Sequence, residues 1–313
     1  MQVVLCADAS SDIGVGHFMR CLALAQSFDD LGVDCFFLGE ISELGWVQKL
    51  LKANTFLRQI KNSNELNPNK RTVLVLDTYS RISGENILHK FTGVFTCAIV
   101  DNVTPDFGTN ISLHLGPISE NDPEYRKFGN FSSGVGLIPI RREIKRVSYS
   151  RKKNTNQMNG NIILTLGGAN LPISCQIRNY LKENSINLQV LDYALANEET
   201  QLKSLDYPIF LTLSDSVISG GGYSMWESIY LNKHLAVIEL AHNQRDNVLF
   251  AKENQLAHII ARVEQTNFEL VFDKVEIEKY LTQSPMDTDK HSVSSDLPLL
   301  GGNSAAELIM NYL

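Results

Sequence analysis

The chain has 313 residues, of which 43% are hydrophobic and 20% are charged, and its formal net charge is −7. An apolar fraction of this size can fill a core, which excludes a disordered chain, and the acidic balance argues against a general nucleic-acid partner. The length predicts two domains of about 150 residues each, or one large α/β unit.

The sequence shows no sign of a membrane segment or a secretion signal. No apolar run approaches the roughly 18 residues that a membrane-spanning helix needs. The first residues, 1–6, lack a basic region and lead directly into a predicted strand. We therefore expect a cytoplasmic protein with no membrane partner. The cysteines are widely spaced, which predicts free buried thiols and no metal site; they are Cys6, Cys21, Cys35, Cys97 and Cys175.

The first half of the chain alternates between predicted strands and helices. Helical spacing of apolar residues starts at Phe18, and Gly32 is expected to end this helix. Further helices are predicted at 44–53 and 84–91, and strands at 3–6, 33–38, 72–76 and 94–100. Continuous apolar strands that alternate with helices predict a parallel sheet covered on both faces. The pattern weakens between 102 and 149.

A polar segment, 148–160, is predicted to be a linker or an exposed loop. After it the alternation resumes, with predicted strands at 162–166, 188–191, 216–219 and 235–238 and helices at 174–184, 225–231 and 247–255. We therefore expect an N-terminal domain over 1–148 and a C-terminal domain over 160–300. Ligands usually bind at the carboxyl ends of such parallel strands, which predicts a cleft between the domains. The last residues, 301–313, are predicted to form a helix that packs back on the N-terminal domain.

The first strand-to-helix loop carries the candidate catalytic residue. Gly14 and Gly16 lead into a predicted helix start at His17, where unpaired backbone N–H groups favour an anionic group. His17 can exchange a proton near neutral pH, and Asp8 or Asp12 would orient its ring. The other interpretation is a polar residue packed locally on a glycine turn. The residues alone leave both interpretations open.

Two glycine-rich loops in the second half are candidate phosphate-binding sites. Backbone N–H groups in such loops can surround a diphosphate. One helical turn past Tyr223, the carboxylate of Glu227 would accept hydrogen bonds from a ribose; the alternative is a tight turn with Glu227 in solvent. The glycines of the two loops are Gly167 and Gly168 in the first, and Gly220, Gly221 and Gly222 in the second.

Three further positions carry polar residues after predicted strands. Asp77 and Asp101 each end a strand, where an acid either faces the cleft or caps the next element. Asn243 and Gln244 follow the strand at 235–238, and their amides could read a base or a sugar.

Together these motifs resemble a known family, the UDP-2,4-diacetamido-2,4,6-trideoxy-β-L-altropyranose hydrolases of pseudaminic acid biosynthesis. Gly14-Val-Gly-His17, followed by Arg20 to Ala25, is similar to the family's opening. Other segments follow in the family's order, at 77–79, 100–102, 134–144, 166–168, 218–227, 243–244 and 301–309. The sequence departs from the family at Thr78, Asn102 and Arg142, and the first two changes concern the sugar more than the nucleotide.

The resemblance implies a GT-B-like α/β fold with two Rossmann-like domains whose parallel sheets face across a cleft. It implies that His17 activates water to release UDP and a free diacetamido-trideoxy-hexose, without metal or cofactor. The implied substrate-binding residues are Asp8, Gly14, Gly16, Arg20, Tyr79, Asn243 and Gln244. The implied nucleotide-binding residues are Gly167, Gly168, Gly220, Gly221, Gly222, Tyr223, Ser224 and Glu227. Two alternatives are a glycosyltransferase with a nucleotide-sugar donor and a non-catalytic nucleotide-sugar-binding protein.

Overall fold

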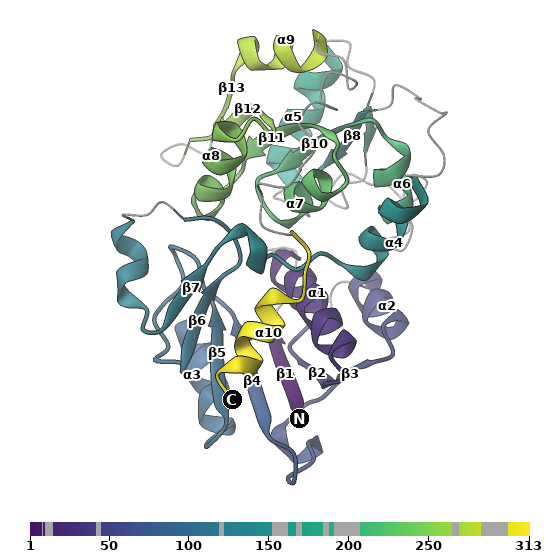
Figure 1. Cartoon of the computed structure of the whole chain (residues 1–313). Helices are drawn as coiled ribbons and strands as arrows, with labels where there is room; N and C mark the ends of the chain where they lie inside the picture. The colour runs from purple at the N-terminus through teal and green to yellow at the C-terminus, as the bar shows by residue number, and fades with distance from the viewer. Residues whose placement is uncertain are drawn as a thin grey trace. The chain divides into compact units, whose positions relative to one another are not determined.

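The protein is described from a computed structural model. The structure describes residues 1–7, 9, 15–41, 45–118, 122–151, 162–166, 171–183, 188–190, 207–264, 269–282 and 300–313, without the side chains of 149–151, 171–174 and 188–190. The chain divides into two compact units (Figure 1): unit 1 comprises Met1–Arg141 and Pro298–Leu313, and unit 2 comprises Arg142–Leu297.

Unit 1 is built on a parallel sheet of seven strands in the order β3-β2-β1-β4-β5-β6-β7. The strands are β1 (Gln2–Ala7), β2 (Asp34–Leu38), β3 (Leu57–Gln59), β4 (Thr72–Asp77), β5 (Phe95–Ile99), β6 (Ile111–His114) and β7 (Phe131–Ser133). The strand order reverses direction between β1 and β4, and such a switch point is where open α/β sheets bind ligands at the strands' carboxyl ends. Every residue of β1 is buried, which explains its continuous apolar run.

The helices of unit 1 cover this sheet. They are α1 (Gly16–Asp30), α2 (Gly45–Ala53), α3 (Arg81–Lys90) and α10 (Ser304–Asn311), with short 3₁₀ helices at Ser63–Glu65, Pro123–Lys127 and Val135–Leu137. The apolar face of α1 buries Phe18, Leu22 and Ala25 in the core beside β1. Helix α10 lies beside α1 (Figure 1) and adds Ala306 and Ile309 to the same core. The C-terminal residues are therefore part of unit 1.

The two ends of α1 are built differently. At its C-terminus, Gly32 adopts a φ of +73°, a left-handed conformation that glycine accepts without strain, and its N–H binds the carbonyl of Asp29. At its N-terminus, Val15 offers no side-chain cap. The first turn of α1 thus lacks the side-chain acceptor that Ser, Thr, Asp or Asn would supply there.

Unit 2 has a six-stranded sheet in the order β13-β12-β11-β10-β8-β9. Its strands are β8 (Ile162–Thr165), β9 (Leu188–Val190), β10 (Ser216–Gly220), β11 (His234–Glu239), β12 (His258–Val263) and β13 (Leu270–Phe272), and only the β12–β13 pair is antiparallel among them. The helices are α4 (Arg142–Arg151), α5 (Leu171–Glu183), α6 (Tyr207–Leu213), α7 (Tyr223–Tyr230), η4 (His242–Gln244), α8 (Arg245–Glu253) and α9 (Lys274–Thr282).

The predicted alternation of strands and helices is confirmed, with additions. The structure adds the strands β3, β6, β7, β12 and β13 and the helices α4, α6 and α9. Helix α4 runs to Arg151, into the segment predicted as a linker, and the division between the units falls at Arg141/Arg142, earlier than the predicted boundary at 148. The rest of that segment lies outside the described residues. No helix in the described part of the chain is long and apolar enough to cross a membrane.

Candidate active site

A histidine and an aspartate meet at the carboxyl edge of the unit 1 sheet. His17 is in the first turn of α1, and Asp77 is the last residue of β4, in register with Ala7 at the end of β1. The strand order therefore brings the start of α1 next to the end of β4. Nδ1 of His17 lies 2.6 Å from Oδ1 of Asp77, and the two residues are only 6% and 0% exposed. This pair is buried and directly hydrogen-bonded.

Arg20 binds the same carboxylate. It lies one helical turn after His17 on α1, and its Nε and Nη2 donate to Oδ2 and Oδ1 of Asp77 at 2.6 and 2.5 Å. Burial alone would raise the pKa of Asp77, but the charges of Arg20 and His17 outweigh it and hold that pKa well below its ordinary value. Arg20 was predicted to bind the substrate, and in the structure its guanidinium binds Asp77.

The charges fix how His17 presents its ring. An ionised Asp77 only accepts hydrogen bonds, so Nδ1 of His17 carries the proton and Nε2 carries the free lone pair. The structure records no partner for Nε2 among the described residues. The opposite charges of Arg20 and Asp77 leave the group without net charge when His17 is neutral. Nε2 is therefore arranged to accept a proton.

Tyr79 closes one side of the histidine. Its ring meets that of His17 edge-on with centroids 4.5 Å apart. Its hydroxyl donates to Oδ2 of Asp101, whose Oδ1 accepts from the N–H of Val103 at 3.1 Å and the hydroxyl of Thr104 at 3.0 Å. Burial raises the pKa of Tyr79; Asp101 acts in the same direction and Arg20 opposes both. Tyr79 therefore stays a protonated donor, and Asp101 both caps a turn and holds Tyr79.

The structure adds an acid to those expected to orient His17. Asp8 and Asp12 lie outside the described residues, so their part stays a prediction, and the acceptor that the structure shows on Nδ1 is Asp77. Asp77 was expected to face the cleft or to cap the next element, and the structure shows it fully buried at the end of β4 and hydrogen-bonded to His17 and Arg20 of α1. A sequence signal for Asp77 does exist. It is the acid that ends β4, the strand next to β1 in a sheet of this topology.

The remaining unit 1 predictions are only partly covered. Gly14 lies outside the described residues. Gly16 is the first residue of α1, and a Cβ there would meet open space. Cys21 is a buried thiol whose Sγ lies 3.6 Å from Oδ2 of Asp77, and burial raises the pKa of that thiol. Cys175 is exposed rather than buried as predicted.

In unit 2 the glycine loop joins β10 to α7, and its middle glycine faces inward. The N–H of Gly221 donates to the carbonyl of Ile238 at 3.2 Å and to Oε1 of Gln244 at 3.0 Å. This N–H is therefore already used within the protein, contrary to the expectation that the loop leaves its N–H groups free. Gly222 is the N-cap of α7 and offers no side-chain cap.

Other predicted nucleotide contacts lie near this loop. Tyr223 and Ser224 form the first turn of α7, and Asn243 lies on the short helix η4 beside Gln244. Glu227 is only 1% exposed, so it is not the solvated side chain of the alternative interpretation. Its contact with a ribose stays a prediction. Gly167 and Gly168 lie outside the described residues.

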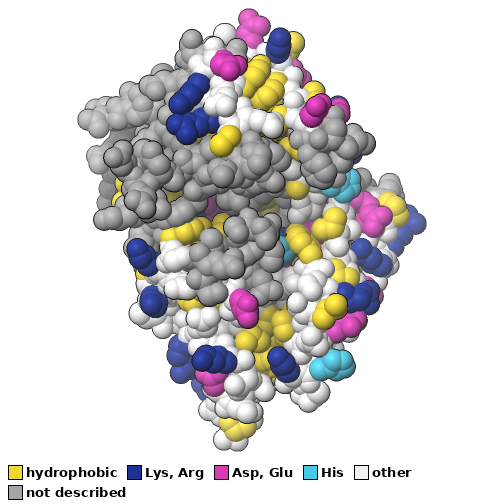
Figure 2. Space-filling view, turned by 180° about the vertical axis from the view of Figure 1, so that it is seen from behind, with side chains coloured by type: hydrophobic (Ala, Val, Ile, Leu, Met, Phe, Trp, Pro, Cys, Tyr) yellow, Lys and Arg dark blue, Asp and Glu magenta, His cyan; other side chains and the backbone are white. Residues whose placement is uncertain are grey.

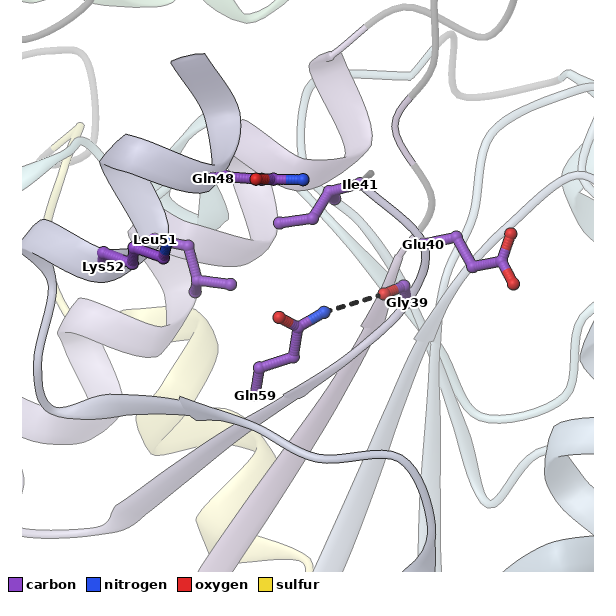
Figure 3. A pocket seen from close by; sticks show the side chains of 7 residues that line it. All are labelled: Gly39, Glu40, Ile41, Gln48, Leu51, Lys52 and Gln59. Atoms are coloured by element: carbon purple, nitrogen blue, oxygen red, sulfur yellow. Dashed lines mark hydrogen bonds between the residues drawn. The ribbon is translucent and has the colours of Figure 1, made fainter. Parts of the chain in front are cut away.

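A separate cavity of about 450 Å³ lies at the β2–β3 edge of unit 1 (Figure 3). The amide of Gln59 donates to the carbonyl of Gly39 at 3.3 Å across one side of it, and Glu40 points away from the other lining side chains. Neither His17 nor its neighbours Arg20, Asp77 and Tyr79 line this cavity. Within the described part of the chain, no cluster of His, Cys, Asp and Glu could hold a metal ion. On the face shown in Figure 2, basic and acidic side chains are interspersed.

No model of a known protein family matches the chain. It is 25% identical over 218 residues to the UDP-2,4-diacetamido-2,4,6-trideoxy-β-L-altropyranose hydrolase of Campylobacter jejuni. This match covers 66% of this chain and 73% of that protein. It is 21% identical over 293 residues to a Helicobacter pylori protein named pseudaminic acid cytidylyltransferase and UDP-2,4-diacetamido-2,4,6-trideoxy-β-L-altropyranose hydrolase. That match covers 89% of this chain and 52% of the relative, so the chain spans about half its length.

Similar folds are found among solved structures. The UDP-GlcNAc 2-epimerase of Methanocaldococcus jannaschii, in complex with UDP-GlcNAc and UDP, matches with a TM-score of 0.58 and 9% identity over 100% of both chains. The glycotransferase of kitacinnamycin matches with a TM-score of 0.53 and 13% identity over 100% of this chain and 99% of that chain. At such identities the likeness shows the fold alone. The chain therefore has the predicted GT-B-like fold of two Rossmann-like units, and its resemblance to the UDP-diacetamido-trideoxy-altropyranose hydrolases is confirmed by two curated proteins of that name.

Proposed function

We propose that this protein hydrolyses a UDP-linked diacetamido-trideoxy-hexose of pseudaminic acid biosynthesis to UDP and the free sugar. The observation that carries the proposal is the buried His17–Asp77 pair, which leaves Nε2 of His17 as a proton acceptor at the carboxyl edge of the sheet. The names of the two relatives supply the substrate class.

His17 acts as the general base in this proposal. Nε2 takes a proton from water while the water oxygen forms a bond to the anomeric carbon of the sugar. The bond from that carbon to the diphosphate oxygen breaks, and its electron pair leaves with UDP. Asp77 keeps the ring in one tautomer and stabilises the imidazolium that forms. A positioned general base contributes about 10²–10⁴-fold to a rate.

The other predicted residues have supporting roles in the proposal. On the sugar side, Tyr79 contacts the substrate beside His17, together with Asp8 and the glycines Gly14 and Gly16. On the nucleotide side, N–H groups at the start of α7 stabilise the charge on the departing diphosphate. Glu227 binds the ribose, and Asn243 lies near the nucleotide or the sugar. No metal or cofactor takes part, so UDP release is expected to continue in EDTA.

The test is UDP release from the UDP-linked 2,4-diacetamido-2,4,6-trideoxy-β-L-altropyranose. We expect the wild-type protein to release UDP and the His17→Asn variant to be slower by about 10²–10⁴-fold. His89→Asn is the matched control, because His89 is exposed on α3. In ¹⁸O-labelled water the label should enter the sugar, because the bond that breaks is between carbon and oxygen on the sugar side.

Three outcomes would contradict the proposal. Equal rates for the wild-type and His17→Asn proteins would remove His17 from the mechanism. UDP release that requires an added carbohydrate or peptide acceptor would identify a glycosyltransferase. Tight UDP binding without turnover of any nucleotide sugar would identify a binding protein.

A further inference from the structure

The glycine loop of unit 2 is held by one side chain from the next strand-to-helix connection. Oε1 of Gln244 accepts hydrogen bonds from the N–H of Gly221 at 3.0 Å and from the N–H of Leu240 at 3.1 Å. Leu240 directly follows β11, and Gly221 directly follows β10. The amide of Gln244 thus ties the ends of two neighbouring strands together.

The space around the three glycines differs. A Cβ on Gly221 would lie 2.3 Å from Cγ2 of Val248, and a Cβ on Gly220 would lie 2.8 Å from Cδ1 of Leu240. A Cβ on Gly222 would have Nε2 of Gln244 at 3.7 Å as its nearest neighbour. A Cβ on Gly221 would therefore collide with a branched side chain, and one on Gly220 would require the end of Leu240 to move. A Cβ on Gly222 would have more room among the described atoms.

The orientation of the Gln244 amide follows from its partners. Only the carbonyl oxygen of an amide can accept two N–H donors, so Oε1 is the atom that faces Gly221 and Leu240. Nε2 must then point elsewhere, and it lies on the side of Gly222. The structure gives Nε2 no partner among the described residues. Its two N–H groups are therefore donors on the side of Gly222.

We propose that Gln244 is a positioning residue that shapes the glycine loop through Gly221 and directs the diphosphate to the side of Gly222. This inference rests on the proposed function in one respect, namely that a nucleoside diphosphate binds at this loop. Gly221 donates its N–H inward and has a structural role. The phosphate oxygens approach Gly222, where the described side chains leave room and where Nε2 of Gln244 is close.

Two substitutions of Gln244 separate its two ends. In Gln244→Leu, the N–H of Leu240 loses its side-chain acceptor and the N–H of Gly221 keeps only the carbonyl of Ile238. Both amides should therefore exchange hydrogen faster, that of Leu240 more so, and UDP should bind about tenfold more weakly or worse. In Gln244→Glu, a carboxylate oxygen can still accept both N–H groups, so their protection should persist. Its negative charge replaces the donor, so UDP should bind more weakly while uridine binds as in the wild type.

His242→Ala is the control, because His242 is exposed on the same short helix η4. Hydrogen exchange measured by mass spectrometry reports the loop without any ligand, and calorimetry with UDP and uridine reports binding. Unchanged exchange and unchanged UDP affinity in Gln244→Leu would overturn the inference. Equal losses of UDP and uridine in Gln244→Glu would also overturn it. A wild-type protein that binds no UDP would contradict the proposed function, and the exchange data would still decide whether Gln244 holds the loop.

A pair of glycine substitutions tests the side of approach. A Cβ on Gly222 would meet no described atom closer than 3.7 Å. In a folded Gly222→Ala protein, UDP should therefore bind more weakly, with uridine unaffected. Gly221→Ala should lower the melting temperature, because its Cβ would collide with Val248. Unchanged UDP affinity in a folded Gly222→Ala protein would show that the diphosphate does not approach there.

Discussion

The carboxyl edge of the unit 1 sheet and the glycine loop of unit 2 are organised by different forces. In unit 1, the buried residues His17 and Asp77 and the partly buried Arg20 form a hydrogen-bonded group that contains opposite charges, and Tyr79 packs against it. In unit 2, the loop is shaped by backbone N–H groups and by the neutral amide of Gln244. The first arrangement depends on the balance of charges, and the second depends on close packing around glycine.

This difference determines how each region responds to substitution. A buried charge without its partner is costly, so changes in the unit 1 group are expected to reduce stability together with activity. The glycine loop of unit 2 has no such buried charge. Substitutions there are therefore expected to act by steric collision or by weakening ligand binding. The two units can be followed separately because the chain has only two tryptophans, Trp46 in unit 1 and Trp226 in unit 2. Replacing either one with phenylalanine leaves the other as the reporter.

The largest loss of stability is expected for Asp77→Asn. The substitution removes the negative charge that Arg20 faces, and breaking a buried ion pair in this way costs about 3–5 kcal/mol. Urea unfolding followed by Trp46 fluorescence measures this free energy. Adding Arg20→Met should recover part of the loss, because it removes the unpaired charge. If the free-energy losses of Asp77→Asn and Arg20→Met simply add in the double variant, the pairing of these two charges does not stabilise this edge of the sheet.

A smaller loss is expected for Tyr79→Phe. Without the hydroxyl, Oδ2 of Asp101 loses the donor that the structure shows, at a cost of about 1–3 kcal/mol. Tyr312→Phe is the matched control, because Tyr312 is 47% exposed on the surface of the same unit. The same urea unfolding curves should separate the two variants. Equal stability of both would show that the Tyr79–Asp101 contact does not contribute.

The two units should also differ in their sensitivity to acid. Burial lowers the pKa of His234 in unit 2; His258 adds to this effect, and the carbonyl of Tyr280 opposes it. Because the unfolded chain then binds the proton more readily, unit 2 should lose stability as the pH falls below about 6.5. The pKa of Asp77 in unit 1 is also lowered, but its stabilising effect is present above about pH 4 and is lost only below that value.

This pH dependence can be measured by urea unfolding between about pH 8 and pH 3, with each tryptophan as the reporter of its own unit. His234→Gln should flatten the curve of unit 2 between about pH 7 and pH 5 and leave that of unit 1 unchanged. A variant whose unit 2 loses stability as steeply as the wild type would contradict the role given to His234.

The smallest effect is expected for Asp34→Asn. Asp34 pairs with Lys70 on the surface of unit 1, where the two side chains are 43% and 39% exposed. Such a pair contributes at most about 1 kcal/mol, because water screens it. Trp46 fluorescence in urea again provides the measurement. A loss as large as that of Asp77→Asn would show that burial is not what distinguishes the two carboxylates.

The buried strands were predictable because their sequence pattern reflects their position. Strands β1, β4 and β11 are paired on both sides, and each has an apolar run of at least four residues. The short strands β3 and β7 lie at the two edges of their sheet and contain polar residues. Their pattern resembles that of loops, so pairing with a neighbour is what makes them strands.

The candidate site was predictable only where its signal is local. His17 and the glycine loop were found because each is a short pattern between a strand and a helix. The partner of His17 was sought in Asp8 and Asp12, which are near it in the sequence, whereas Asp77 is 60 residues away. The inward direction of the Gly221 N–H likewise depends on Gln244, which is 23 residues further along the chain.

The sequence by itself therefore determined the alternating α/β architecture, the family resemblance, His17 and the position of the glycine loop. These features are encoded in periodicity and in short motifs, which act over a few residues. Only the tertiary structure decided that Asp77 and Arg20 accompany His17 and that Gln244 occupies the N–H of Gly221. Such contacts depend on which strands become neighbours, and strand order is a property of the folded sheet rather than of any one segment.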